Sequence, residues 1–255
     1  MYPKNVKSSK QSARFLTARR RLNRRLAVAA VAVVAFLGVV LAGHLTNGRR
    51  QVAAPTASPS ASAGAGGARA GEFTFVRRAQ ADPMAVGAVD APVVLVQWTD
   101  MRCPYCAVFN RETLPMLLKE YVDTGKLRIE VHDVAYFGEQ SEQAAVAARA
   151  AAEQGKFFEF IRAVYKDAPE HKHPDLPRAK LIAYAQKAGV PDIAKFTTDL
   201  DDPGLRAAAD ASNSEAAQLG VTSVPFFVAG DRTLSGAQPS SVFRSYLDDA
   251  IAKAG

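Results

Sequence analysis

The feature that most constrains this chain is a pair of cysteines, Cys103 and Cys106, which are the only cysteines among its 255 residues. The apolar run at residues 92–96 predicts a buried strand before the pair, and residues 107–118 predict a helix after it. Two cysteines at this spacing, at a junction between a strand and a helix, indicate a site that exchanges thiols for a disulfide.

The position of each cysteine predicts its chemical role. Cys103 is expected to cap the N-terminus of the helix, where unpaired N–H groups and the helix dipole stabilise an anion. Because the thiolate is the reactive form, the pKa of Cys103 is expected to fall to between ~3.5 and ~7.5. Pro104 suits the first helical turn, since its missing N–H is not needed there. Cys106 comes one turn later and is expected to be more buried, so Cys103 is the predicted attacking thiol and Cys106 the resolving thiol.

Other roles for two neighbouring cysteines fit this sequence less well. A structural disulfide between residues three apart closes too short a loop to add much stability. A zinc site needs four ligands, and the sequence offers no second C-x-x-C pair. His171 and His173 lie in a polar loop without a third ligand, and we interpret them as solvated loop residues. No metal and no organic cofactor is therefore expected.

The charge of the chain is divided between a basic N-terminal part and a mildly acidic remainder. The formal net charge is +7, yet residues 1–71 hold twelve Lys or Arg and no Asp or Glu. The remainder holds 20 basic against 25 acidic residues, a net charge of −5. A nucleic-acid-binding protein needs a basic folded face, so no nucleic-acid partner is expected.

An apolar run of 18 residues, residues 26–43, follows a basic tail at residues 1–25. This length is near the lower limit for a helix that crosses a membrane. Nine positive charges precede the run, so the positive-inside rule places the N-terminus in the cytoplasm and the rest of the chain outside. We interpret the run as an uncleaved signal anchor in the cell membrane. The alternative is a signal peptide cleaved at residues 40–42, which would release a secreted form.

The remaining sequence predicts a linker and one folded domain. Residues 44–71 are rich in Ala, Ser, Gly and Pro, which is typical of a flexible linker, and the folded domain is expected at residues 72–255. In the domain we expect strands at 73–76, 93–98, 127–134, 225–229 and 232–234, a turn at 86–92, a helical insertion at about 139–219 and a closing helix at 240–253. Pro115 is expected to kink the helix after the cysteine pair or to end its first half. The predicted fold class is α/β, with a central mixed sheet flanked by helices.

Two short motifs carry a family resemblance. Residues 98–106 read Trp-Thr-Asp-Met-Arg-Cys-Pro-Tyr-Cys, and residues 222–227 read Thr-Ser-Val-Pro-Phe-Phe. Together with a helical insertion, and with a further similarity at residues 154–160, they resemble the DsbA family of extracytoplasmic thiol:disulfide oxidoreductases. The resemblance covers residues 72–255 and implies a thioredoxin fold with an inserted all-helical subdomain. The membrane anchor is similar to that of actinobacterial members.

The resemblance implies a second half of the site at Val224 and Pro225. By resemblance, Pro225 is in the cis form and faces Cys103 across the fold. The N–H and C=O of Val224 would then pair with an extended substrate peptide, which adds to the site as a strand. The alternative is an ordinary trans Pro at the start of an edge strand.

One position departs from the family pattern. Six residues before the first cysteine, the resemblance implies a buried Glu or Asp that helps to move the proton of the resolving thiol. This chain has Gln97 there, and Gln cannot titrate. Either water or another group handles the proton, or Asp100 acts as the proton relay. The alternative for Asp100 is a turn or capping residue beside the start of the helix.

The function implied by the resemblance is donation of disulfide bonds to reduced exported proteins. Pro104 and Tyr105 tune the redox potential through the stability of the Cys103 thiolate, and Tyr offers no positive charge, so a moderately oxidising site is expected. A membrane partner, DsbB-like or similar to vitamin K epoxide reductase, would reoxidise Cys103 and Cys106. The alternatives are a reductase or isomerase on the same fold, and a peptide-binding holdase with a non-catalytic cysteine pair. The sequence shows no added dimerisation module, so a monomer is expected.

Overall fold

The computed structural model of the protein describes residues 72–255. The predicted basic tail, membrane anchor and linker, at residues 1–25, 26–43 and 44–71, lie outside this part. Across the described residues, no helix has the length and apolar character needed to cross a bilayer.

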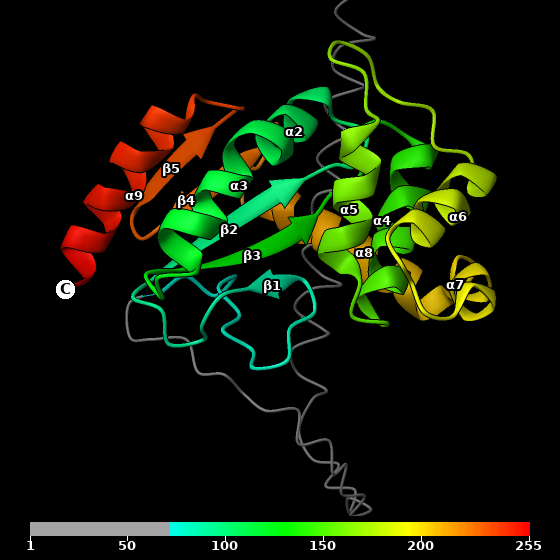
Figure 1. The fold of residues 1–255 in the computed structure, drawn as a ribbon, viewed down its shortest axis with the longest axis horizontal. Coiled ribbons are helices and arrows are strands. Elements are labelled where there is room, and N and C mark those ends of the chain that lie inside the picture. The colour runs from blue at the N-terminus through cyan, green and yellow to red at the C-terminus, as the bar shows by residue number, and fades with distance from the viewer. Residues whose placement is uncertain (1–71) are drawn as a thin grey trace, which may run out of the picture. The chain divides into compact units, whose positions relative to one another are not determined.

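A five-stranded mixed sheet lies at the centre, with the strand order β1-β3-β2-β4-β5 (Figure 1). The central strand β2 (Val93–Thr99) runs parallel to β3 (Leu127–Asp133) and antiparallel to β4 (Phe226–Ala229). The edges are β1 (Ala85–Val86) and β5 (Arg232–Ser235). Every residue of β2 and β3 is buried, as expected for strands covered on both faces. The predicted mixed sheet flanked by helices is confirmed.

The first strand does not lie where the sequence predicted it. Residues 73–76 form a turn, in which the N–H of Val76 donates to the carbonyl of Phe73 at 3.0 Å. The strand is β1 instead, and it ends just before Gly87, where a turn was predicted. A Cβ on Gly87 would lie 2.5 Å from the carbonyl oxygen of Leu127, and the φ of Gly87 is +100°. Glycine therefore lets the chain approach β3 closely, a constraint that a short apolar alternation cannot reveal.

One irregular helical segment follows the cysteine pair. It consists of α2 (Pro104–Val108), the π-helix η1 (Phe109–Thr113), α3 (Leu114–Leu117) and the π-helix η2 (Leu118–Val122). Pro115 lies in the first turn of α3 and has no N–H to continue an α-helical ladder. The wider π turns on either side accommodate this gap. The predicted irregularity at Pro115 is confirmed.

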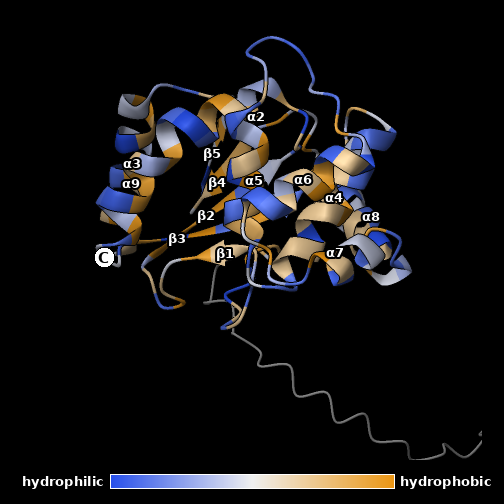
Figure 2. Cartoon of the chain, turned by 45° about the vertical axis from the view of Figure 1, so that its right-hand side comes forward, coloured by the Kyte–Doolittle hydropathy of each residue, from blue (hydrophilic) through white to orange (hydrophobic). Residues whose placement is uncertain are grey.

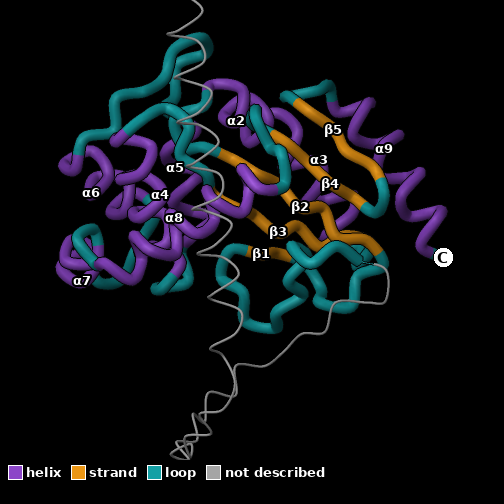
Figure 3. The backbone as a smooth tube through the Cα atoms, turned by 180° about the vertical axis from the view of Figure 1, so that it is seen from behind, coloured by secondary structure: helices purple, strands orange, loops and turns teal. Residues whose placement is uncertain are grey.

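Five helices lie between β3 and β4 and stand beside the sheet (Figures 1 and 3). They are α4 (Glu139–Ala152), α5 (Phe157–Lys166), α6 (Arg178–Lys187), α7 (Ile193–Asp199) and α8 (Pro203–Gln218). Aspartate side chains cap two of them: Asp192 accepts from the N–H of Lys195 at 2.8 Å and Asp202 from that of Leu205 at 2.9 Å. The closing helix α9 (Ser240–Ala254) returns across the sheet, on the same face as α2 and α3 (Figure 1).

Three phenylalanines join the sheet to the helices on that face. Phe109 comes from η1, Phe227 from β4 and Phe243 from α9, and all three are fully buried. Their ring centroids lie 4.6 to 5.1 Å apart. Burial of each ring contributes about 1.5–3 kcal/mol. Figure 2 shows the same pattern, with hydrophobic residues concentrated on the strands and hydrophilic ones on the outer surfaces of the helices.

The opposite face of the sheet holds a buried histidine beside a tryptophan. The rings of Trp98 and His132 lie 5.3 Å apart. Burial, followed by the charges of Arg77 and Arg149, lowers the pKa of His132 to about 3. Glu215 lies 3.3 Å from Nδ1 of His132, but its side chain is about half exposed, so water screens its charge and burial dominates. His132 is therefore neutral in the folded protein at physiological pH.

We expect the free energy of unfolding to fall by about 2 kcal/mol between pH 7 and pH 5 because of His132. The unfolded chain binds a proton on this residue at the ordinary histidine pKa, whereas the folded protein does not until about pH 3. The contribution of His132 to the free energy of unfolding is thus complete above about pH 6.5 and is lost as the pH falls toward 3. Urea denaturation of the wild type and of His132→Gln at both pH values tests this. Equal losses of stability in the two proteins would contradict it.

Candidate active site

The cysteine pair lies where β2 ends and α2 begins (Figure 1). Cys103 is the N-cap residue of α2, and its sulfur accepts a hydrogen bond from the N–H of Cys106 at 3.4 Å. Pro104 occupies the first turn, as predicted. The two thiols are free rather than bonded to each other. The local sequence therefore directs the first N–H groups of α2 at the sulfur of Cys103, where they stabilise a thiolate.

The two cysteines differ in acidity. A hydrogen bond from the Cys106 thiol lowers the pKa of Cys103, and backbone N–H groups of Cys106 and Tyr105 lower it further, against the opposing effect of burial. Burial, and then the neighbouring Cys103, raise the pKa of Cys106 well above its usual value. Cys106 is completely buried, whereas Cys103 keeps 3% of its surface exposed. This arrangement fits Cys103 as the attacking thiol and Cys106 as the resolving thiol.

The loop that holds Val224 and Pro225 lies directly against Cys103. The bond between these two residues is cis, as the family resemblance implies. The thiol of Cys103 donates to the carbonyl of Val224 at 3.4 Å. The carbonyl of Pro225 accepts from the N–H of Gly236 at 2.8 Å, which fixes the loop beside β5. No group among residues 72–255 accepts a hydrogen bond from the N–H of Val224.

A groove of about 930 Å³ opens over Cys103. Its lining residues are Cys103, Pro104, Tyr105, Ala135, Tyr136, Phe137, His171, His173, Ala217, Val221, Thr222, Ser223 and Val224. Tyr105 is 61% exposed at its edge. The groove thus presents aromatic and apolar side chains, with few charges, beside the reactive sulfur.

The two histidines of the polar loop contribute to this groove, which the sequence did not indicate. The ring of His173 stacks on that of Phe137 with 3.9 Å between centroids. Its Nδ1 lies 2.9 Å from the carbonyl oxygen of Arg102, next to the first cysteine. Both histidines are exposed, as predicted, but they form part of the site. No local pattern marks them, because Phe137 and His173 meet only in the fold.

The carboxylate of Asp100 holds the backbone around the site. It accepts from the N–H of Arg102 and from that of Tyr136, both at 2.7 Å, and from the hydroxyl of Ser141 at 2.9 Å. Burial raises the pKa of Asp100, and these hydrogen bonds oppose that effect. Its two oxygens therefore join the loop before Cys103 to the segment that leads into α4. This geometry favours a structural role over a proton relay.

Gln97 lies buried in the middle of β2, opposite Val131 of β3 and Phe227 of β4. Side chains alternate along a strand, so Gln97 faces the same side of the sheet as Thr99. The position where the resemblance implies an acid therefore lies on the side of the sheet that holds Cys106, but it provides no titratable group.

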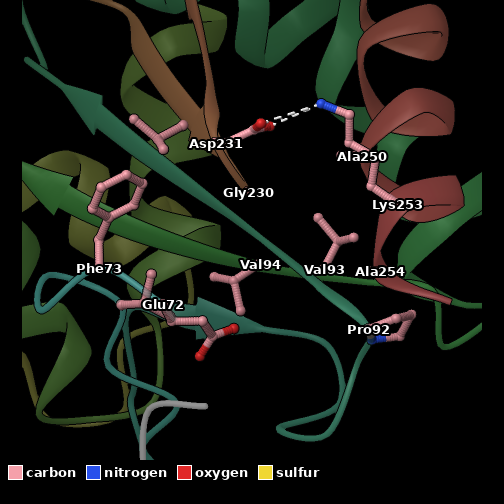
Figure 4. Close-up of a pocket in the computed structure, with 12 residues that line it drawn as sticks. Glu72, Phe73, Pro92, Val93, Val94, Gly230, Asp231, Ala250, Lys253 and Ala254 are labelled. Carbon is pink, nitrogen blue, oxygen red and sulfur yellow. Dashed lines mark hydrogen bonds and ion pairs between the residues drawn. The ribbon is translucent and has the colours of Figure 1, made fainter. Parts of the chain in front are cut away.

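A second pocket, of about 420 Å³, lies at the other end of the sheet (Figure 4). Val93 and Val94, at the start of β2, form part of its wall, and Phe73 lies at its edge. An ion pair between Asp231 and Lys253, at 3.1 Å, borders it. This pocket shares no lining residue with the groove over Cys103 and holds no cysteine, so it is not part of the thiol site.

Comparison with known proteins gives a family and several relatives. Residues 79–249 match the family model described as Thioredoxin. The probable disulfide bond formation protein D of Bacillus cereus is 27% identical over 143 residues, which cover 55% of this chain and 66% of that protein. Disulfide bond formation protein D of Bacillus subtilis is 28% identical over 123 residues, which cover 48% and 51%. The chain therefore spans between about half and two thirds of the length of these relatives.

A solved structure shows the same fold. The crystal structure of oxidised BdbD from Bacillus subtilis aligns with a TM-score of 0.62 at 19% sequence identity. The alignment covers 68% of this chain and 94% of that chain. The predicted thioredoxin-like fold is confirmed.

Proposed function

We propose a function from the premise that this chain belongs to the thioredoxin family and is a DsbA-like member of it. The chain is a thiol:disulfide oxidoreductase that donates the disulfide of Cys103 and Cys106 to reduced exported proteins. The observation that supports this best is the position of Cys103 at the N-terminus of α2, where its sulfur accepts from the N–H of Cys106 at 3.4 Å. The pKa values of the two thiols, lowered at Cys103 and raised at Cys106, agree with this position. The stabilised Cys103 thiolate favours the reduced form of the protein. The oxidised form therefore tends to transfer its disulfide to a substrate.

The exchange proceeds in two steps in the donating direction. A substrate thiolate attacks the sulfur of Cys103, the bond between the two cysteines breaks, and Cys106 leaves with the electron pair and takes up a proton. A second thiolate of the substrate then attacks the substrate sulfur of this mixed disulfide. Cys103 leaves as a thiolate, so the substrate is oxidised by two electrons and the cysteine pair is reduced by two.

Docking of an extended substrate follows from the position of Val224. Its N–H is free, and its carbonyl is held only by the Cys103 thiol. That carbonyl loses its donor when Cys103 is in a disulfide. Both groups can then pair with the backbone of a peptide whose cysteine lies over Cys103. The groove beside them, with Tyr105 and Phe137, accepts apolar side chains of the same peptide.

The setting of the reaction is proposed from the sequence. Residues 26–43 anchor the chain in the cell membrane, and the positive charges before them keep the N-terminus in the cytoplasm. The catalytic domain then works outside the membrane, where disulfides persist. A membrane partner, DsbB-like or similar to vitamin K epoxide reductase, reoxidises the cysteine pair.

Redox equilibration of the full-length chain with glutathione tests the direction of the exchange. Acid quenching and thiol alkylation at each ratio of reduced to oxidised glutathione give the reduction potential. We expect a value between those of thioredoxin, ~−270 mV, and DsbA, ~−120 mV, because Tyr105 adds no positive charge beside the thiolate. A potential as low as that of thioredoxin would instead support the reductase alternative.

A further inference from the structure

Two buried hydroxyl groups lie beside the sulfur of Cys106, and the exchange described above does not use them. Thr99 is the last residue of β2, and Tyr165 lies in α5. Their oxygen atoms are 2.7 Å apart. The hydroxyl of Tyr165 also donates to the carbonyl of Asp100 at 3.1 Å. The Thr99 side chain lies close enough to Cys106 to lower the pKa of that thiol, against the larger effect of burial. The side chains of Thr99, Tyr165 and Cys106 have no exposed surface.

The nearby carboxylate does not occupy this position. The backbone of Asp100 also lowers the pKa of Cys106, but the oxygens of its carboxylate are taken by Arg102, Tyr136 and Ser141. Gln97 provides no acid. The Cys106 thiolate that forms during exchange is therefore stabilised by neutral donors, in a place where burial opposes any charge.

Hydroxyl groups suit this task because each can donate one hydrogen bond and accept others. When Cys106 is a thiol, it donates to Cys103, while Thr99 donates to Tyr165 and Tyr165 donates to the Asp100 carbonyl. When Cys106 is a thiolate, Thr99 turns to donate to the sulfur, Tyr165 turns to donate to Thr99, and the Asp100 carbonyl loses Tyr165 as its donor. Only hydrogen atoms turn, and the heavy atoms keep their places. The hydrogen bond from Thr99 to the thiolate is stronger than its hydrogen bond to the Tyr165 hydroxyl, because the thiolate is charged.

We propose that Thr99 is a catalytic residue that stabilises the Cys106 thiolate during disulfide exchange, and that Tyr165 is a positioning residue that orients the Thr99 hydroxyl. When Cys106 leaves, the electron pair of the broken disulfide stays on its sulfur and the Thr99 hydroxyl donates to it. The proton that Cys106 finally takes up replaces the one that the substrate thiol lost to solvent. In the reverse direction the same bond stabilises Cys106 as it attacks. The inference rests on the proposed thiol exchange at this site.

The rate at which Cys106 resolves a mixed disulfide tests this role. The reduced full-length chain is mixed with excess glutathione disulfide at pH 7, quenched with acid and analysed by mass spectrometry. This gives the rate of adduct formation at Cys103 and the rate of its resolution separately. We expect Thr99→Val to slow resolution about 3- to 10-fold: the lost hydrogen bond raises the pKa of Cys106 further, so less thiolate is present at pH 7, and the greater nucleophilicity of a more basic thiolate offsets about half of that loss. Adduct formation should change by less than about twofold.

Three further variants separate the hydroxyl from packing. Thr99→Ser keeps the hydroxyl and is expected to resolve at the wild-type rate, and Tyr165→Phe is expected to slow resolution about twofold to threefold. Tyr246→Phe is the matched control. Tyr246 is a buried residue of α9, and its hydroxyl also donates to a backbone carbonyl, that of Arg232 in β5, at 2.8 Å. It should leave both rates unchanged.

Three results would overturn the proposal, two of them for Thr99 and one for Tyr165. Equal slowing in Thr99→Val and Thr99→Ser would show that packing matters rather than the hydroxyl, and wild-type resolution in Thr99→Val would remove the role of Thr99. Wild-type resolution in Tyr165→Phe would remove the role assigned to Tyr165. These rates do not depend on the direction in which the couple runs in the cell. A low reduction potential would therefore contradict the proposed disulfide donation and leave this inference standing.

Discussion

Replacing Cys103 with serine is expected to abolish disulfide transfer by this chain, with a loss of at least about 1,000-fold. A hydroxyl cannot form the disulfide that a substrate thiolate must attack, and the remaining Cys106 is fully buried with a raised pKa. The measurement is the oxidation of a reduced two-cysteine peptide in glutathione buffer, followed by loss of free thiols. The rate with Cys103→Ser should equal the rate without protein.

The same variant separates the enzyme from the holdase alternative. A holdase would bind unfolded chains through the groove, so suppression of the aggregation of a denatured protein should be its main activity. Cys103→Ser leaves the groove residues in place and changes one atom at its floor. If the chain is an oxidoreductase, this variant loses oxidation while peptide binding persists. Oxidation that survives in Cys103→Ser would contradict the assigned role.

Replacing Cys106 with serine is expected to trap mixed disulfides. Cys103 keeps the helix N-terminus and a hydroxyl donor beside its sulfur, so it still reacts with a substrate disulfide. The adduct then lacks the neighbouring thiol that resolves it. Intramolecular attack by a held group corresponds to effective concentrations of about 10⁵ M or more, so the adduct should persist at least about 100-fold longer than in the wild type.

Non-reducing electrophoresis and mass spectrometry follow these adducts. A peptide disulfide serves as the substrate, and Cys103→Ser is the negative control, since it offers no accessible sulfur. A reducing agent should release one molecule of peptide for each molecule of the Cys106→Ser protein. Adducts that decay as fast as those of the wild type would show that resolution does not need Cys106.

The parts of the site that local sequence determines were predicted well. The C-x-x-C spacing and Pro104 specify a helix start, and the helix N-terminus lies against Cys103 as expected. Pro115 marked the irregular helix because it has no N–H, whatever its surroundings. The short run at residues 73–76 misled, because two apolar alternations fit a turn as well as a strand. The approach of Gly87 to β3 decides that edge of the sheet, and only the fold shows it.

The parts of the site that depend on distant contacts could not be read from the residues alone. Thr99 and Tyr165 are 66 positions apart, and nothing in the sequence around either residue indicates that their hydroxyls meet. Phe137 and His173 likewise form one wall of the groove from separate loops. The contact between Val224 and Cys103, across 121 residues, was expected from the family resemblance rather than from spacing.

A single turnover of disulfide transfer tests the proposed function most directly. The oxidised full-length chain is mixed with an equal amount of a reduced, unfolded two-cysteine protein, and the thiols of both are trapped over time. We expect the substrate to gain one disulfide for each Cys103–Cys106 bond that is lost, faster than with glutathione disulfide at the same concentration. A chain that stays oxidised while the substrate keeps its thiols, or that in its reduced form removes disulfides from the oxidised substrate instead, would contradict disulfide donation.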